Sequence, residues 1–154
     1  MRQLKVWLHN IRSMHNVGSA FRSCDALGAG ELILTGYTPL PPRPEISKTA
    51  LGADETVAWR TLPNPIDTII KLKTDGYRLI GIEQTKNSRL IKHLKVNSND
   101  KIILFFGNEV TGLDNELLPH MEDCYEIPQY GQKHSLNVSV SIGITLYHIL
   151  DRCP

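Results

Sequence analysis

The 154-residue chain lacks several features that mark particular protein classes. It has only three cysteines, Cys24, Cys124 and Cys153, and they are dispersed without the close pairs of a metal or redox centre. Such usage is typical of reduced thiols in a cytosolic protein. No apolar run is long enough to cross a bilayer, and the first residues lack the apolar core of a signal peptide. We therefore expect a cytoplasmic protein without a membrane segment.

The chain also lacks a large excess of either positive or negative residues. Lysine and arginine number 17 against 16 aspartates and glutamates, which gives a formal net charge of +1. Nucleic-acid-binding domains usually carry a basic surplus, so RNA binding by this chain would need a local patch, or a patch doubled by dimerisation. The six histidines do not have the spacing of metal ligands, and we expect no metal site. The length suits one domain, 1–154, with a sizeable core.

Short apolar strands alternate with helical segments along the chain. We expect strands at 4–8, 31–35, 55–61, 77–83 and 102–106, and helices at 17–27, 66–72 and 138–151, with Asn16 capping the first helix. Residues 36–46 hold four prolines and should be irregular, with a loop at 47–54. Fully apolar strands are typical of a parallel sheet covered on both faces. The sequence thus predicts an α/β fold with a mainly parallel sheet and helices on both faces.

One candidate ligand-binding segment follows the apolar strand 102–106, where the chain reads FFGNEVTGL. Gly107, Glu109 and Gly112 come directly after this strand. Glycines at the carboxyl end of a parallel strand let a ligand approach the backbone, and open α/β sheets bind ligands at that edge. Two glycines spaced around a glutamate are weak evidence for a ligand site by themselves, so the interpretation depends on a second segment.

That second segment, 127–143, reads IPQYGQKHSLNVSVSIG. A polar loop leads through Ser135, Leu136 and Asn137 into a long apolar helix, and either Ser135 or Asn137 is a good N-cap. A helix that opens this way presents free backbone N–H groups and small polar side chains. It suits a carboxylate, a phosphate or a hydroxyl group, although the same residues would also serve a core helix without a ligand.

Together with NVGSAFRSC at 16–24, these two segments resemble the three motifs of the SpoU (TrmH) branch of the SPOUT RNA 2′-O-ribose methyltransferases. The resemblance covers nearly the whole chain. It implies a C-terminal trefoil knot, a homodimer, and S-adenosylmethionine as the methyl donor. It also implies that backbone at Gly107, Ile127 and Leu136 holds the cofactor, with Ile82 and Glu83 on the wall of the adenosine pocket.

The resemblance further implies a set of catalytic residues: Glu109, Ser135 and Asn137 would fix the loops and the substrate sugar. Arg22, with Asn16 nearby, would come from the partner subunit and meet the ribose and its phosphate. The guanidinium group of arginine stays protonated in proteins and is therefore a poor general base, so we favour an electrostatic role for Arg22. The sequence leaves open whether it acts as the base.

The implied function is transfer of a methyl group to a ribose 2′-hydroxyl of RNA. The lack of extensions resembles minimal tRNA-acting members, and the SKTALGADETV segment resembles the enzymes that act on a guanosine of the tRNA D-loop. A wobble-position tRNA enzyme and a ribosomal RNA enzyme remain alternatives. A non-catalytic RNA-binding relative is a second alternative, against which the joint presence of Arg22, Glu109, Ser135 and Asn137 argues. A Rossmann-type enzyme would need a GxGxxG motif after the first strand, and the sequence there does not supply one.

Overall fold

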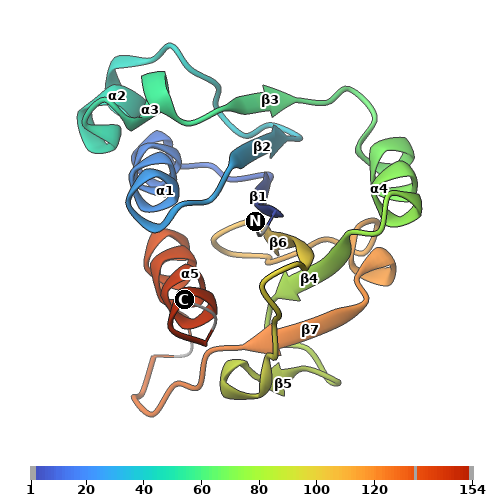
Figure 1. The fold of residues 1–154 in the computed structure, drawn as a ribbon. Helices are drawn as coiled ribbons and strands as arrows, with labels where there is room; N and C mark the ends of the chain where they lie inside the picture. Colours follow the sequence, from blue (N-terminus) through green and yellow to red (C-terminus); the bar gives the residue numbers. More distant parts are fainter. Residues whose placement is uncertain (1–2, 134, 153–154) are drawn as a thin grey trace.

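A parallel β-sheet forms the centre of the structure, a computed structural model that describes residues 3–133 and 135–152 (Figure 1). The strand order is β3-β2-β1-β6-β4-β7-β5, and every pair of neighbouring strands runs parallel. The strands are β1 (Gln3–His9), β2 (Glu31–Thr35), β3 (Trp59–Thr61), β4 (Arg78–Ile82), β5 (Arg89–Leu90), β6 (Lys101–Phe106) and β7 (Asp123–Glu126). The predicted, mainly parallel α/β fold is therefore confirmed.

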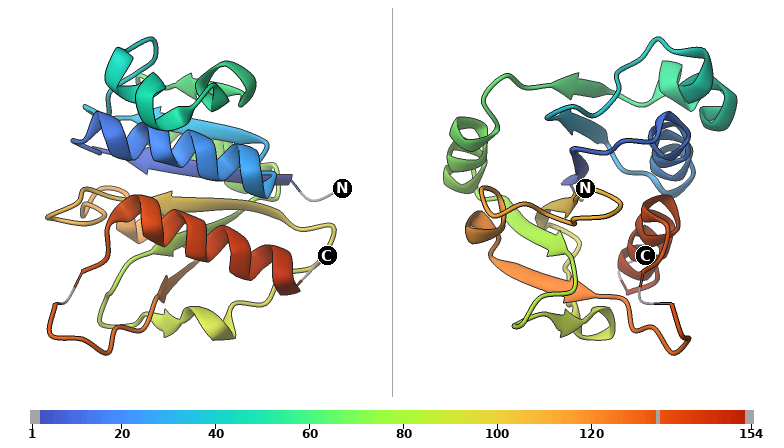
Figure 2. Two further views of the ribbon diagram at one scale, coloured as in Figure 1. Left: turned by 90° about the vertical axis from the view of Figure 1, so that its left-hand side faces the viewer. Right: turned by 180° about the vertical axis from the view of Figure 1, so that it is seen from behind.

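Helices cover both faces of the sheet. They are α1 (Met14–Leu27), α2 (Pro44–Ala50), α3 (Ala53–Thr56), α4 (Pro65–Thr74) and α5 (Val138–Arg152), with short 3-10 turns η1 (Ile91–His93) and η2 (Leu118–His120). On one face, α1 and α5 pack side by side, and their apolar residues join one core cluster with alternate residues of β1 and β6 (Figure 2). On the other face, Ile69 and Leu72 of α4 pack on Trp7 and Phe105.

The alternation of side chains along each strand explains the two layers of the core. In β1, Leu4, Val6 and Leu8 point to the face covered by α1 and α5, whereas Trp7 points to the other face. The ring of Trp7 stacks on Phe105 of β6, with the ring centroids 4.8 Å apart. Because central strands bury both faces, they read as continuous apolar runs, which is why the sequence located them correctly.

The first helix begins earlier than the sequence indicated. Ser13, not Asn16, is the N-cap, and its hydroxyl accepts a hydrogen bond from the backbone N–H of Asn16 at 3.2 Å. The prediction chose Asn16 because asparagine is a strong capping residue, but the Asn16 side chain has another partner, Glu109. Helix α1 therefore gains one turn at its N-terminus.

The proline-rich region also differs from the prediction. Residues 44–50 form helix α2 and residues 53–56 form α3, where we expected an irregular segment and a loop, and strand β3 is confined to Trp59–Thr61. Pro44 stands in the first turn of α2, where its missing N–H has no helical partner to lose. Ile46 and Ala50, four residues apart, are buried against α1, and this packing forms the helix.

The remaining assignments agree with the structure. The helix predicted at 66–72 is α4, the strand at 77–83 is β4, and the helix at 138–151 is α5. Cys24 and Cys124 are free thiols, and burial raises the pKa of Cys24 to about 12, while Cys153 lies outside the described residues. Among the described residues, every helix is too short or too polar to cross a membrane.

The contact between α1 and α2 depends on Gly18. A Cβ atom at this position would lie 2.0 Å from Thr49 Oγ1 and 2.2 Å from the carbonyl oxygen of Ile46, far inside van der Waals contact. A glycine in the middle of a helix is otherwise unfavourable. Close packing of the two helices therefore accounts for Gly18. At Gly143, in the middle of α5, an added Cβ atom would lie 3.9 Å from Ser23 Oγ, which is ordinary van der Waals contact.

These two glycines give a matched pair of predictions. We expect Gly18→Ala to lower the free energy of unfolding by about 1–3 kcal/mol, because the methyl group forces α1 and α2 apart. Gly143→Ala should raise it by up to about 1 kcal/mol, through the better helix propensity of alanine. Urea denaturation of both variants at one protein concentration measures the difference, and equal effects would contradict the packing argument.

Candidate active site

A cleft opens at the edge of the sheet where strands β4, β6 and β7 end. Its volume is about 230 Å³, and it is walled by the segments after these strands and by the residues that lead into α5. The lining residues are Ile82, Glu83, Gln84, Phe106, Gly107, Asn108, Glu109, Val110, Gly112, Glu126, Ile127, Gln129, Ser135, Leu136, Val138 and Ser141. Ligands of open α/β sheets bind at this edge, so the cleft is the candidate binding site.

Seven of the ten residues with a role predicted from the sequence line this cleft. All five with a predicted cofactor role do so: Ile82, Glu83, Gly107, Ile127 and Leu136. Two of the five with a predicted catalytic role, Glu109 and Ser135, line it as well. Asn16, Arg22 and Asn137 lie outside it. The roles of all ten stay predictions.

The loop 107–113 has a tightly determined shape. Asn108 and Gly112 exchange backbone hydrogen bonds, at 3.0 and 2.9 Å, and Asn108 Oδ1 accepts the N–H groups of Val110 and Thr111. Gly112 has φ = 73°, and a Cβ there would lie 2.2 Å from a carboxylate oxygen of Glu83. Gly112 is therefore required both by its backbone conformation and by the approach of Glu83, which accepts the N–H of Leu113 at 2.8 Å.

Glu109 joins this loop to the beginning of α1. Its carboxylate accepts hydrogen bonds from the backbone N–H groups of Arg12 and Ser13 and from the side-chain amide of Asn16, at 3.0–3.1 Å. Burial alone would raise the pKa of Glu109, but these hydrogen bonds outweigh it and hold the pKa below its ordinary value. Glu109 is therefore an ionised anchor at the positive end of a helix and a poor proton acceptor.

The three predicted residues outside the cleft have separate environments. The Asn16 amide is bound to Glu109, as described, and the residue is buried. Arg22 is exposed on α1, away from the cleft of its own chain. Asn137 caps α5, since its Oδ1 accepts the N–H of Ser139 at 2.8 Å. Of the two N-caps considered from the sequence, the structure selects Asn137.

Among the polar residues of the cleft that sequence reasoning overlooked are Gln84 and Glu126. Both lie at or just after the carboxyl end of a strand, which is the signal that could have identified them. The Glu126 carboxylate accepts a hydrogen bond from Ser88 Oγ, which ties β7 to the segment after β4. With Glu83 and Glu109, the cleft therefore has three carboxylates, and its field favours a ligand that carries positive charge.

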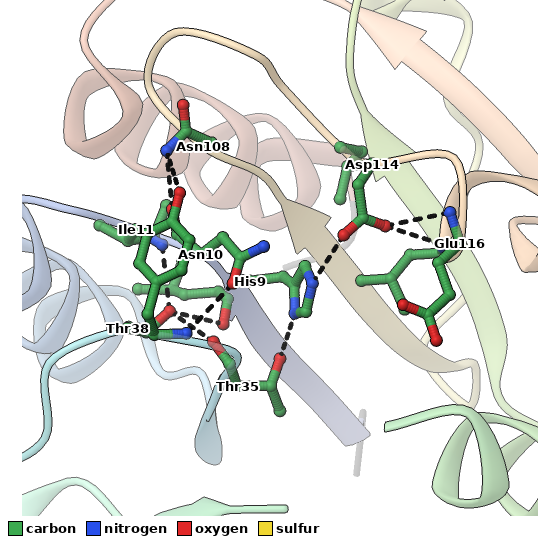
Figure 3. A network of polar contacts seen from close by, with 12 residues as sticks. His9, Asn10, Ile11, Thr35, Thr38, Asn108, Asp114 and Glu116 are labelled. Atoms are coloured by element: carbon green, nitrogen blue, oxygen red, sulfur yellow. Dashed lines mark hydrogen bonds and ion pairs between the residues drawn. The ribbon is translucent and has the colours of Figure 1, made fainter. Parts of the chain in front are cut away.

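A buried chain of hydrogen bonds supports the loop from the other side (Figure 3). The indole N–H of Trp7 can only donate, so Thr35 Oγ1 accepts it, at 2.7 Å. The Thr35 hydroxyl can then donate to His9 Nδ1 at 2.8 Å, and in the neutral ring His9 Nε2 donates to Asp114 Oδ2 at 2.9 Å. Asp114 directly follows the loop and also accepts the N–H groups of Glu116 and Leu117, so it fixes the end of the loop on β1 and β2.

Among the described residues, no three histidine, cysteine, aspartate or glutamate side chains gather closely enough to hold a metal ion. His134, one of the six histidines considered above, lies outside those residues. The cleft is instead built from apolar walls, amides, hydroxyls and carboxylates. This composition is typical of a pocket for a small organic ligand with several polar groups.

Fold and cleft together define a parallel α/β protein with a ligand site at the carboxyl edge of its sheet. A model of the SpoU rRNA methylase family matches residues 3–147, and the chain belongs to this family.

Relatives and solved structures agree with this assignment. The chain is 29% identical over 147 residues to a tRNA (guanosine(18)-2′-O)-methyltransferase of Aquifex aeolicus, covering 95% of this chain and 68% of the relative. It is 33% identical over 139 residues to a 23S rRNA (guanosine-2′-O-)-methyltransferase of Neisseria meningitidis, covering 90% and 54%. The crystal structure of an AdoMet-bound rRNA methyltransferase from Sinorhizobium meliloti superimposes with a TM-score of 0.87 at 28% identity, covering 95% and 55%. The chain thus spans between about half and two thirds of the length of these three proteins.

The anchoring role of Glu109 predicts a pH-dependent effect of Glu109→Gln. At about pH 7 the variant should be less stable by about 1–2 kcal/mol, the usual scale for losing a helix N-terminal acceptor. Because the folded-state pKa is lowered, the stabilisation by the carboxylate is present above the unfolded-state pKa. It is lost as the pH falls through the folded-state value. Urea denaturation at about pH 7 and about pH 3.5 should therefore show the two proteins converging in acid. Glu116→Gln, at an exposed position, is the control, and a difference that does not change with pH would contradict the prediction.

Proposed function

We propose that this chain is an RNA 2′-O-ribose methyltransferase that uses S-adenosylmethionine and acts on tRNA. The observation that carries the proposal is the cleft, where loops from three parts of the sequence meet. Family membership supports it, as do the named activities of the relatives from Aquifex aeolicus and Neisseria meningitidis. Because those relatives are named for tRNA and for ribosomal RNA, ribosomal RNA is the alternative substrate.

The residues of the cleft fit the proposed cofactor. Ile82, Ile127 and Leu136 offer apolar walls for a flat base, and the backbone at Gly107 would hold its polar edge. Glu83 and Glu126 supply acceptors for ribose hydroxyls and for an ammonium group. The bound cofactor supplies an electrophilic methyl group on a positively charged sulfur, which the three carboxylates favour. The AdoMet-bound relative from Sinorhizobium meliloti supports this assignment.

Positioning should account for most of the catalysis. The chain has to align the ribose oxygen with the methyl group, and the braced loop 107–113 provides a rigid wall for this purpose. Glu109 is held ionised by its hydrogen-bond donors, so it positions α1 and does not take the proton of the hydroxyl. Ser135 and Asn137 fix the entrance of α5, next to the cleft. Arg22, always charged, would orient the phosphate and stabilise the developing negative charge on the ribose oxygen.

A homodimer is the second part of the proposal. An apolar stripe on α5 is left uncovered, formed by Val140, Ile144 and Tyr147, which are 48%, 39% and 62% exposed. It lies beside α1, whose outer face includes the exposed Arg22 (Figure 2). A second copy on this stripe would cover the apolar side chains. It would also bring Arg22 of the partner subunit toward a cleft that its own chain does not reach.

The C-terminal segment is proposed to be threaded as a trefoil knot, as in the SPOUT methyltransferases. Such threading is rare among proteins. The physical use would be to lock the loops at 107–113 and 127–137 against each other as one cup. In the cell the protein would act in the cytoplasm, where its RNA substrate is found.

A local basic patch would compensate for the small net charge. Arg22, Arg43 and Lys48 are exposed on α1 and on or just before α2, which pack against each other. They would contact phosphates and so position the RNA without reading its sequence. In a dimer the patch would occur twice. A non-catalytic RNA-binding protein would need the same patch, and only an assay of methyl transfer separates the two functions.

The enzymatic proposal is tested by incubating the protein with S-adenosylmethionine and unmodified tRNA transcripts, followed by mass spectrometry of the nucleosides. We expect a 2′-O-methylated nucleoside to form without added metal. Calorimetry should show binding of S-adenosylmethionine, weakened at least about tenfold in Leu136→Lys, which places a positive charge on an apolar wall beside a cationic ligand. Ile70→Lys, at an exposed position on α4, is the matched control. Binding of a nicotinamide dinucleotide, with no binding of either adenosyl ligand, would contradict the proposal.

The shared site is tested at Arg22. We expect Arg22→Ala to keep its fold and cofactor affinity, while methyl transfer falls at least ~100-fold, the scale for losing one charge-stabilising group. Arg22→Lys should restore little, because a point charge does not replace a planar fork of donors. Asn137→Ala should also weaken cofactor binding, since Asn137 caps α5.

A mixing experiment then decides which subunit provides Arg22. Subunits with Arg22→Ala and subunits with Asn137→Ala, each inactive alone, should form a heterodimer with one intact site. Recovered activity in a verified heterodimer supports the shared site. An inactive heterodimer, or sedimentation of the wild-type protein near 17.3 kDa with full activity, would refute it.

A further inference from the structure

Tyr37 is an exposed aromatic residue that is held at both ends. Its side chain is 61% exposed, yet its hydroxyl accepts a hydrogen bond from Asn108 Nδ2 at 2.9 Å. Its backbone N–H donates to Asn10 Oδ1 at 3.1 Å. Exposed tyrosines have no need of such fixed partners, because water satisfies the hydroxyl group. The two bonds therefore hold a large apolar surface in one orientation in front of solvent.

Hydrogen bonds also fix the segment that presents Tyr37 to the neighbouring residues (Figure 3). The next residue, Thr38, is buried, and its hydroxyl accepts the N–H of Ile11 and donates to the carbonyl of Thr35 at 2.7 Å. The preceding residue, Gly36, has φ = 65°, and a Cβ there would lie 1.8 Å from Asn10 Oδ1. The turn after β2 is thus built around the contact with Asn10, and Tyr37 is ordered before any ligand arrives.

Asn108 connects this ring to the candidate active site. Its Nδ2 donates both to Tyr37 and to the carbonyl of Asn10, and its Oδ1 accepts two N–H groups of the loop, so the whole side chain is engaged. Asn108 also lines the cleft. The hydroxyl group of Tyr37 is therefore hydrogen-bonded to a residue that forms part of the cleft wall. In the segment between β1 and α1, Arg12 is exposed and takes part in no ion pair among the described residues, so its charge is free for a phosphate.

We propose that Tyr37 is a stacking platform for an unpaired RNA base that adjoins the nucleotide whose ribose enters the cleft. The proposal rests on the proposed RNA methyltransferase function and adds a substrate-binding residue to it. RNA outside double helices is recognised by stacking splayed bases on aromatic side chains. A ring that is already immobilised loses little conformational entropy when a base stacks on it. Arg12 would contact the adjoining phosphate. Asn108, through its hydrogen bond to the Tyr37 hydroxyl, would hold the ring, and with it the stacked base, at a fixed position relative to the cleft.

The test measures KM for RNA, kcat and the affinity for S-adenosylmethionine, using an unmodified tRNA transcript that the wild-type protein methylates. Tyr37→Ala should raise KM for the transcript about tenfold or more, the scale for losing one base–aromatic stack. The affinity for S-adenosylmethionine and kcat at saturating RNA should change little. Tyr37→Phe keeps the ring and should recover most of the lost affinity, whereas Tyr37→Leu should not. Ile70→Ala, at an apolar position on α4 that is 53% exposed, is the control.

A second measurement covers the case in which the alanine variant fails to fold. Tyr37→Trp should show fluorescence quenching on addition of the transcript, beyond any change in the wild-type protein, because the new indole would stack on a base.

Four results would overturn the inference: an unchanged KM in Tyr37→Ala, a loss in Tyr37→Phe as large as in Tyr37→Ala, an unquenched Tyr37→Trp, or a changed oligomeric state in Tyr37→Ala. The last would mean that a second copy of the chain covers the ring. A wild-type protein that methylates no RNA would instead refute the proposed function.

Discussion

The carboxylate of Glu109 is the interaction on which the candidate site depends most. It lies on the loop after β6 and accepts the backbone N–H groups of Arg12 and Ser13, directly before α1, and the side-chain amide of Asn16, so one ionised group joins two of the three sequence motifs. The positive end of the helix and the negative side chain stabilise each other. The orientation of α1, and with it the position of Arg22, is therefore set by the same loop that walls the cleft.

The loop 107–113 is braced on three sides by groups that are distant in the sequence. Glu83 holds its inner side, Asn10 and Tyr37 hold Asn108, and His9 holds Asp114 at its end. Each brace uses a buried or half-buried polar group, for which a missing partner would be costly. A loop of this kind keeps its shape without a ligand. This suits a reaction in which alignment matters more than proton transfer.

One face of α1 is buried in the core and the other is exposed. The inner face, with Val17, Phe21 and Cys24, is buried in the core, while Arg22 on the outer face is left to solvent in this chain. The exposed stripe of Val140, Ile144 and Tyr147 lies on α5, the helix that packs beside α1. An exposed apolar stripe of this kind is the surface on which the proposed dimer would form.

The sequence by itself determined the central strands of the parallel sheet, the helices α1, α4 and α5, and the edge of the sheet where the cleft lies, but it did not indicate the edge strand β5. The reason is that apolar runs and the glycines at strand ends are local signals, and carboxyl ends of parallel strands meet at one edge. Only the tertiary structure decided that Ser13 caps α1, because the amide of Asn16 is bound to Glu109, 93 positions away. It likewise decided that residues 44–50 form a helix and that Tyr37 is fixed by Asn108. Such pairings join residues far apart in the chain, and they leave no periodic pattern in the sequence from which to predict them.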